Sequence, residues 1–454
     1  MSPVRVVDVS YVPVPAQAAL PPEPIKLNAM EVQWVVLPLF QHILFFEGDQ
    51  LPPFEAVVHS LKSSLAETLA THGPLAGKLV HLADTGEIAI RCSHDDGVKF
   101  VVAESGADAR RLAGDEEHNV HAFERLVPEL DLSVLPAPLL AVQATRLQGG
   151  GVAVGVTVHH GVADGRSLWR FVEAWAAACR GGVPPAAPSF DRSRVKLRLP
   201  VGDKELARSV LLKYAPNLPM TNMILREERL RFTRRTFTLN GGHIARLKQH
   251  IIRLSEAHDG RTSLLRPPSS FVAVTALTWT CSVRCRSSPS SSPTDDDDDV
   301  FLFFFADLRS HLDPPAGADY FGACISGCLP RLPARDLRSD HALAAAAVAI
   351  QEAIRDMEAD PVGGWDFLTL CTGLSEVNSP YFNVSGSTSF RPYEVADFGW
   401  GRPRRTEPVR MNRDGQVALV RARDGDGVQV SVAMLQRAHM EAFKAEFFNA
   451  IVNV

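Results

Sequence analysis

Two histidines end an apolar run and are followed by a carboxylate. The run Gly151–Val158 is rich in β-branched residues, His159 and His160 come next, and Asp164 follows. Of the 15 histidines in the chain, only His160 has an aspartate four residues later. A neutral imidazole, with an ordinary pKa of about 6.5, can take a proton from a hydroxyl group and pass it to a leaving group. The pattern indicates a general base, although an arbitrary His and Asp at this spacing is more often a structural turn.

The elements around these residues must aim one imidazole at a site. The apolar run is expected to be a strand, and side chains at successive strand positions point to opposite faces, so only one of the two histidines can face the site. The residues after Asp164 have helical spacing, with Asp164 as the expected N-cap and Gly181 just beyond the end. No Gly-x-Ser-x-Gly turn is present, so no acyl-enzyme on such a serine is expected.

The composition is that of a globular protein with more than one core. A chain of 454 residues with 46% hydrophobic and 22% charged residues predicts two domains. The net charge of −5 gives no basic excess for nucleic acid, and no apolar stretch is long enough for a signal peptide or a membrane span. The seven cysteines are expected to be reduced thiols, not metal ligands. These features predict a cytoplasmic monomer that binds neither nucleic acid, membrane nor metal.

The pattern of elements divides the chain into three parts. Residues 1–190 alternate strand-like and helix-like segments, residues 191–230 have a weaker pattern and more charge, as expected of a crossover linker, and residues 231–454 form a second α/β domain. In the second domain, Ser270–Ala273 is expected to be a strand. The Ser/Pro/Asp-rich segment Ser287–Asp299 is expected to be a solvated loop, with an acidic metal or partner site as the alternative.

Further segments carry a resemblance to a known family. Asp397-Phe-Gly-Trp-Gly401 lies near the C-terminus, and Asp307-Leu-Arg309 lies before it. The His-x-x-x-Asp motif in the middle of the chain and Asp-Phe-Gly-Trp-Gly near its end, in this order and at this separation, resemble the plant BAHD acyltransferases over essentially the whole length. Asp-Phe-Gly also occurs in protein kinases, but the Gly-rich loop, Val-Ala-Ile-Lys and His-Arg-Asp motifs are absent, which excludes a kinase.

The resemblance implies an α/β fold of two chloramphenicol-acetyltransferase-like domains, with mixed sheets flanked by helices and an active-site channel between them. It implies an acyltransferase of class EC 2.3.1 that uses an acyl-CoA co-substrate and no permanently bound cofactor. His160 is the implied catalytic base, in preference to His159. Asp164 is implied to turn away from the channel and pair with Arg309.

The resemblance also assigns supporting residues. It implies that the Asp-Phe-Gly-Trp-Gly motif has a structural role, carried by Asp397, Gly399, Trp400 and Gly401. It places Lys248, Ser269 and Ser270 in contact with coenzyme A. A solvated charge on an amphipathic helix is an equally good reading of Lys248.

The segment Tyr320-Phe-Gly-Ala-Cys324 looks like the Tyr-Phe-Gly-Asn-Cys motif of the flavonoid-glycoside branch, with Ala323 in place of Asn. It favours transfer of a malonyl group from malonyl-CoA to the sugar hydroxyl of a flavonoid, anthocyanin or other phenolic glucoside. Arg166 is the candidate cation for the malonyl carboxylate, or else a solvated arginine at a helix start. The alternatives are a hydroxycinnamoyl donor acting on a phenolic glycoside, alcohol or amine, a thioester or ester hydrolase, and a catalytically silent ligand-binding protein.

Overall fold

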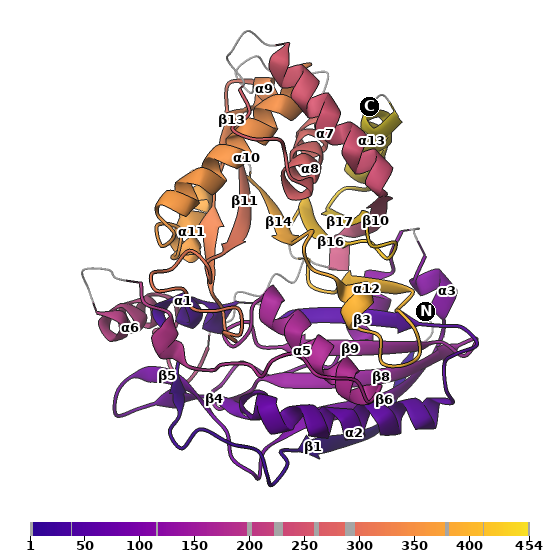
Figure 1. The fold of residues 1–454 in the computed structure, drawn as a ribbon, viewed down its shortest axis with the longest axis vertical. Helices are drawn as coiled ribbons and strands as arrows, with labels where there is room; N and C mark the ends of the chain where they lie inside the picture. Colours follow the sequence, from indigo (N-terminus) through magenta and orange to yellow (C-terminus); the bar gives the residue numbers. More distant parts are fainter. Residues whose placement is uncertain are drawn as a thin grey trace.

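The structure is a computed structural model that describes residues 3–37, 39–114, 117–197, 202–221, 230–257, 263–286, 296–376, 381–411 and 413–452. Two α/β bodies lie one above the other, each built on its own large sheet (Figure 1). Most of the expected Ser/Pro/Asp-rich loop lies outside the described residues. No helix within the described ranges is both long and apolar enough to cross a membrane.

The first body is built on a mixed six-stranded sheet with the order β1-β6-β8-β9-β3-β15. Its strands are β1 (Val4–Pro13), β3 (Phe40–Phe46), β6 (Gly97–Asp108), β8 (Leu140–Gln148), β9 (Val152–Val158) and β15 (Arg405–Pro408). Strand β9 is buried along its whole length, as its unbroken apolar run predicts. Strand β3 pairs with it in antiparallel register, with Phe40 opposite Val158.

Two long helices, α2 (Phe54–His72) and α5 (Gly165–Cys179), pack together against this sheet (Figure 1). The indole N–H of Trp175 on α5 donates to the carbonyl of Leu61 on α2, at 3.1 Å, so the contact is polar as well as apolar. A four-stranded sheet with the order β2-β5-β4-β7 completes the body. Its strands are β2 (Ile25–Lys26), β4 (Lys78–Leu82), β5 (Glu87–Arg91) and β7 (Ala137–Pro138).

The second body is a seven-stranded sheet with the order β10-β17-β16-β14-β11-β12, and β13 pairs with β11. The strands are β10 (Thr233–Leu239), β11 (Asp299–Asp307), β12 (Ile325–Cys328), β13 (Arg331–Pro333), β14 (Tyr381–Gly386), β16 (Gln416–Arg421) and β17 (Val428–Met434). The helices that pack with it are α7 (Gly241–Glu256), α8 (Ser270–Arg284), α9 (Ala334–Arg338), α10 (Ala342–Ala359) and α13 (Arg437–Val452) (Figure 1).

Short elements connect these parts. They are α1 (Ala29–Val32), η1 (Gln33–Val36), η2 (Gly73–Ala76), α3 (Ala109–Leu112), α4 (Val120–Arg125), η3 (Arg192–Arg194), α6 (Asp203–Tyr214), α11 (Phe367–Glu376) and α12 (Pro392–Val395). The described residues of the segment expected to be a crossover linker thus include the short helix η3 and the longer helix α6.

The chain crosses between the bodies more often than a single linker suggests. Strand β15 comes late in the sequence but pairs with β3 of the first sheet, with Pro408 opposite His42. The second body therefore lends a strand to the first, and the cavity between them is lined by both.

The expectation of a strand at Ser270–Ala273 is wrong, because these residues begin helix α8. Every residue from Val272 to Val283 is buried, including three threonines and a serine, so the helix has no polar face toward solvent and no apolar stripe from which its period can be read.

Candidate active site

A cavity of about 830 Å³ lies between the two bodies. Its walls come from β3, the turn after β9, the start of α5, the second sheet and β15. His160 lines it, while His159 does not. The expectation that only one of the two histidines faces the site is met, and His160 is the one that does.

His160 is held between aromatic rings. The indole of Trp34 stacks on its imidazole with ring centroids 3.6 Å apart and planes 4° apart, and the ring of Phe40 lies at 4.4 Å. Burial lowers the pKa of His160 to about 3, so the imidazole is neutral at physiological pH. Its Nδ1 is buried and has no hydrogen-bond partner within the described part of the chain. A neutral ring on the cavity wall can act as a proton acceptor.

His159 points the other way and is satisfied locally. It is 1% exposed, and its Nδ1 accepts a hydrogen bond from the Gly161 backbone N–H at 3.0 Å. Burial lowers the pKa of His159 to about 4. This histidine is a structural part of the turn that presents His160.

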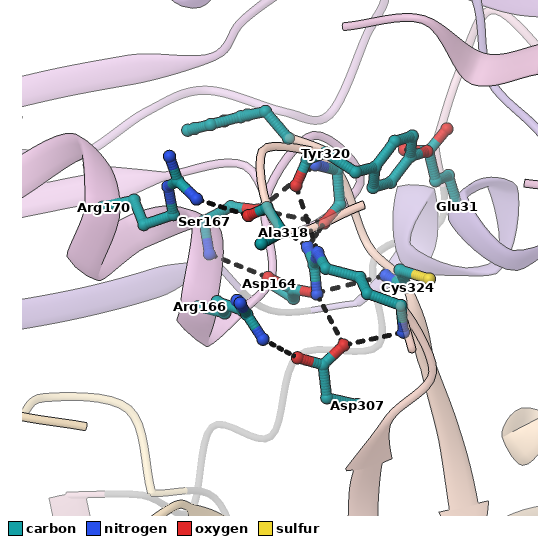
Figure 2. Close-up of polar contacts among 12 residues, drawn as sticks. Glu31, Asp164, Arg166, Ser167, Arg170, Asp307, Ala318, Tyr320 and Cys324 are labelled. Carbon is teal, nitrogen blue, oxygen red and sulfur yellow. Dashed lines mark hydrogen bonds and ion pairs between the residues drawn. The ribbon is translucent and has the colours of Figure 1, made fainter. Parts of the chain in front are cut away.

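Asp164 caps helix α5 and pairs with Arg309, as the motifs implied (Figure 2). Its Oδ1 accepts from the backbone N–H of Ser167 at 2.9 Å, and its Oδ2 lies 2.8 Å from Arg309 Nη1 and 3.2 Å from the Cys324 backbone nitrogen. Burial alone would raise the pKa of Asp164, but the Arg309 guanidinium and these N–H groups hold it below its usual value. The carboxylate is thus held by these groups and makes no hydrogen bond to the imidazole, although Asp164 lines the cavity and its negative charge partly opposes the lowering of the His160 pKa.

Arg309 joins the start of α5 to the loop before β12 through hydrogen bonds to both segments. Its side chain is 2% exposed and donates to the carbonyls of Tyr320 and Gly322, at 3.1 and 2.9 Å, and to the hydroxyl of Ser167 at 3.1 Å. A buried guanidinium with this many acceptors fixes the relative position of the two segments.

Arg166 lies on the cavity wall but already has a carboxylate partner (Figure 2). Its Nη1 is 2.7 Å from Asp307 Oδ2, and the other oxygen of Asp307 accepts from Arg309 Nη1 at 3.0 Å. The Arg166 side chain is 40% exposed, so part of the guanidinium still faces the cavity or solvent. The sequence did not predict the pairing with Asp307.

The Tyr320–Cys324 segment braces the two bodies and does not line the cavity. The Tyr320 hydroxyl donates to Glu31 at 3.3 Å, and Arg192 forms an ion pair with Glu31 at 3.0 Å. A Cβ on Gly322 would lie 2.4 Å from a Glu31 carboxylate oxygen, so the glycine leaves room for this buried pair. Burial raises the pKa of Glu31 although Arg192 opposes the shift.

The Asp-Phe-Gly-Trp-Gly segment forms a turn outside the cavity. One Asp397 oxygen accepts from the backbone N–H groups of Gly399 and Gly401, at 2.9 and 3.1 Å, and both glycines have positive φ. Trp400 is largely buried and packs edge-on against Phe46 of the first sheet at 5.5 Å. The geometry is that of a structural turn.

Of the residues expected to contact coenzyme A, the two serines neighbour a residue of the cavity wall, whereas Lys248 lies on α7, which contributes no lining residue. Ser269 caps α8, accepting from Val272 N–H at 3.2 Å, and Phe271 of the same helix lines the cavity. Lys248 is half-buried on α7. Neither serine nor Lys248 belongs to the cavity wall. No group of three or more His, Cys, Asp or Glu side chains in the described ranges is placed to hold a metal ion.

Sequence reasoning missed Trp34 and the aromatic residues beside it. Trp34 lies in η1, in the apolar segment just before strand β3. A signal was present: Asn28 and Glu31 form a capping box, with Asn28 Oδ1 accepting from Glu31 N–H at 3.1 Å, which marks a helical start.

Comparisons with known proteins agree with this geometry. The model of the Transferase family matches residues 12–449. Phenolic glucoside malonyltransferase 1 of Arabidopsis thaliana is 29% identical over 426 residues, which cover 89% of this chain and 88% of that protein. Malonyl-CoA:anthocyanidin 5-O-glucoside-6''-O-malonyltransferase of the same species is 30% identical over 489 residues, covering 98% of both.

Vinorine synthase, a solved structure, has the same fold. It superposes with a TM-score of 0.71 at 19% identity, covering 99% of this chain and 98% of that one. The two-body α/β architecture expected from the motifs is therefore confirmed. With a family match over nearly its whole length and His160 on the wall of the cavity between the bodies, the chain belongs to the BAHD family of acyl-CoA-dependent acyltransferases.

Proposed function

We propose that this acyltransferase moves a malonyl group from malonyl-CoA to a sugar hydroxyl of a flavonoid, anthocyanin or other phenolic glucoside. The observation that carries the proposal is the neutral His160 imidazole on the wall of the cavity between the bodies. The malonyltransferase names of both relatives described above support the donor and the acceptor class.

The reaction needs one proton carrier. His160 takes the proton of the sugar hydroxyl as the oxygen attacks the thioester carbonyl, which gives a tetrahedral intermediate and an imidazolium. The C–S bond then breaks, and the imidazolium returns the proton to the leaving thiolate, giving the malonyl ester and free coenzyme A. The two steps need no acyl-enzyme and no metal ligand set.

The cavity wall supports an acceptor with an aromatic and a hydroxylated part. On the second sheet, Phe303 of β11 lies opposite Asn383 of β14, and Ser385 of β14 lies opposite Ala418 of β16. Because opposite residues share a face, the cavity side of the sheet passes from aromatic at β11 to polar at β14. An aromatic ring with an attached sugar matches that gradient.

Arg166 is the proposed contact for the malonyl carboxylate. An arginine has five N–H donors, and the ion pair with Asp307 is made through one nitrogen, so donors remain for a second carboxylate. The nearby negative charge of Asp307 weakens that attraction. A hydroxycinnamoyl donor is therefore the second candidate, and the aromatic wall of Trp34 and Phe305 favours it.

The coenzyme A contacts, the domain boundaries, the location and the oligomeric state are also proposals. Lys248, Ser269 and Ser270 are proposed to contact coenzyme A, where the N-terminus of α8 approaches the cavity through Phe271. The division into residues 1–190, 191–230 and 231–454 is proposed as the domain plan, with β15 as a strand lent to the first sheet. Action as a cytoplasmic monomer stays a prediction from composition.

A panel of donors and acceptors tests the proposal. Malonyl-CoA and p-coumaroyl-CoA are each incubated with and without phenolic glucosides, free phenols and amines, and thiol release and product mass are measured. Thiol release that requires a glucoside, with a mass gain of one malonyl group, is the expected result. Release without any acceptor indicates a hydrolase, and no release across the panel indicates a binding protein; either result contradicts the proposal.

A further inference from the structure

The indole of Trp34 lies flat on the imidazole of His160. The ring centroids are 3.6 Å apart and the planes differ by 4°, so the two rings are almost parallel. Trp34 comes from η1 of the first body and is 5% exposed. The imidazole therefore has an extended π face against one of its sides.

Residues of the second body hold the indole in place. Phe367 of α11 packs against Trp34 with centroids 4.3 Å apart, and Phe305 of β11 packs against it at 5.4 Å. Phe40 lies against the imidazole itself at 4.4 Å. With aromatic neighbours on several sides, neither stacked ring is free to turn without displacing another.

Proton transfer creates a charge that this site must stabilise. When His160 takes the hydroxyl proton, a buried imidazolium forms. In Ser-His-Asp triads a carboxylate hydrogen-bonded to the histidine stabilises that cation. Here the Asp164 carboxylate is committed to Arg309 at 2.8 Å and to two backbone N–H groups. Within the described ranges, no carboxylate forms an ion pair with His160, and the charge of Asp164 favours the imidazolium only through space.

We infer that the face of the Trp34 indole stabilises the His160 imidazolium during acyl transfer, in the place that a carboxylate occupies in triads. Two neutral aromatic rings prefer offset or edge-to-face arrangements to a close parallel sandwich. A cation over an aromatic face is attracted by the ring quadrupole, most strongly by tryptophan and more so away from water. The observed stack suits the charged form of His160 better than the neutral form.

The inference rests on the proposed role of His160 as the base and makes Trp34 a positioning residue that acts through it. Because the imidazolium exists only after proton transfer has begun, the effect falls on kcat and leaves KM unchanged. Trp34→Phe keeps a smaller π face and is expected to lower kcat two- to threefold. Trp34→Leu keeps apolar bulk without a π face and is expected to lower kcat by about tenfold.

Fluorinated tryptophan separates electrostatics from packing. Fluorine withdraws electron density from the ring and weakens its negative face while the indole shape is nearly kept. The protein is produced with tryptophan carrying one, two or three ring fluorines, and a stepwise fall in kcat with each fluorine is expected. The chain has 6 tryptophans, so Trp34→Phe with the same analogues is the matched control, and its kcat is expected not to depend on fluorine.

The outcomes distinguish this inference from the proposed function. His160→Ala is measured in parallel with the same donor and acceptor. If His160→Ala keeps its rate, the role of His160 as the base is wrong. If His160→Ala is inactive while kcat is unchanged both in Trp34→Leu and in the fluorinated wild type, the function stands and the inference about Trp34 is overturned. The fluorinated protein keeps this test available even if Trp34→Leu does not fold.

Discussion

The carboxylate of Asp164 lies 2.8 Å from the guanidinium of Arg309, and both side chains are almost completely buried. The pair joins the helix that follows His160 to the loop before β12, so the second residue of the His-x-x-x-Asp motif is an anchor. In the proposed mechanism a single base, His160, carries the chemistry, and the geometry of the turn that presents it depends on Arg309, 145 positions after Asp164.

Breaking the anchor should cost stability as well as rate. Asp164→Ala leaves the Arg309 guanidinium buried without its main partner, and loss of one member of a buried ion pair costs about 3–5 kcal/mol. Urea unfolding should show this loss, and kcat should fall in the protein that remains folded. Asp307→Ala, which removes a half-exposed carboxylate from the same network, is the matched control and should cost clearly less. An inactive Asp164→Ala protein with wild-type stability would contradict the anchoring role.

Buried histidines should make the fold lose stability as the pH falls below about 6.5, which is above the pH range in which carboxylates become protonated. Burial lowers the pKa of His42, His72 and His159 to about 4. The unfolded chain, in which histidine has a pKa of about 6.5, binds more protons than the native state between these values. The free energy of unfolding should therefore be at its maximum above about pH 6.5 and should fall as the pH drops from 6.5 to 4.

Urea titrations at pH 7.5, 6 and 5 measure this dependence. His72→Gln removes one of the buried imidazoles outside the cavity and should make the fall with pH less steep. Equal unfolding free energies at pH 7.5 and pH 5 would contradict the burial of neutral histidines.

Donor preference should depend on Arg166. If its guanidinium binds the malonyl carboxylate, Arg166→Ala should lower kcat/KM for malonyl-CoA by about 10- to 100-fold, the value of a charged hydrogen bond, and leave p-coumaroyl-CoA much less affected. Arg170→Ala, one helical turn further along α5, removes an arginine that does not line the cavity and serves as the control. An unchanged ratio of the two donors in Arg166→Ala would rule out the carboxylate contact.

Gly322 should not tolerate a methyl group. Its Cβ would come within 2.4 Å of the Glu31 carboxylate, which is buried and fixed by Arg192 and Tyr320. Gly322→Ala is expected to lower the free energy of unfolding by about 1–3 kcal/mol, as overpacking of a rigid site does. Gly114→Ala, where the nearest atom would be 3.4 Å away, should change stability little. Thermal unfolding of the two variants, compared with wild type, measures the two changes in stability, and equal stability of both variants would contradict the tight contact at Gly322.

Sequence motifs predicted the fold class and the Asp164–Arg309 pair because both depend on residues with distinctive chemistry at recognisable positions. The strand β15 was not predictable in the same way. It is four residues long, three of them polar or charged, and its partner β3 lies more than 350 positions earlier. Only the three-dimensional pairing makes it a strand, and no local pattern records that pairing.

The elements and contacts that line the cavity could not be predicted from the sequence either. Helix α8 is buried on all sides, so the segment Ser270–Ala273 looked like a strand until the length of the buried run was known. The stack of Trp34 on His160 joins residues 126 positions apart, and the pairing of Arg166 with Asp307 joins residues 141 positions apart. Contacts between residues so far apart in the sequence leave no local pattern from which they could be predicted.

The most direct test compares the two neighbouring histidines. Thiol release from malonyl-CoA is measured with and without a phenolic glucoside for wild type, His160→Ala and His159→Ala. The account predicts glucoside-dependent release by wild type. It predicts a loss of roughly 10²–10⁴-fold in His160→Ala, as expected for removal of a general base, and substantial activity in a folded His159→Ala. Glucoside-dependent release at a near-normal rate by His160→Ala would contradict the central claim.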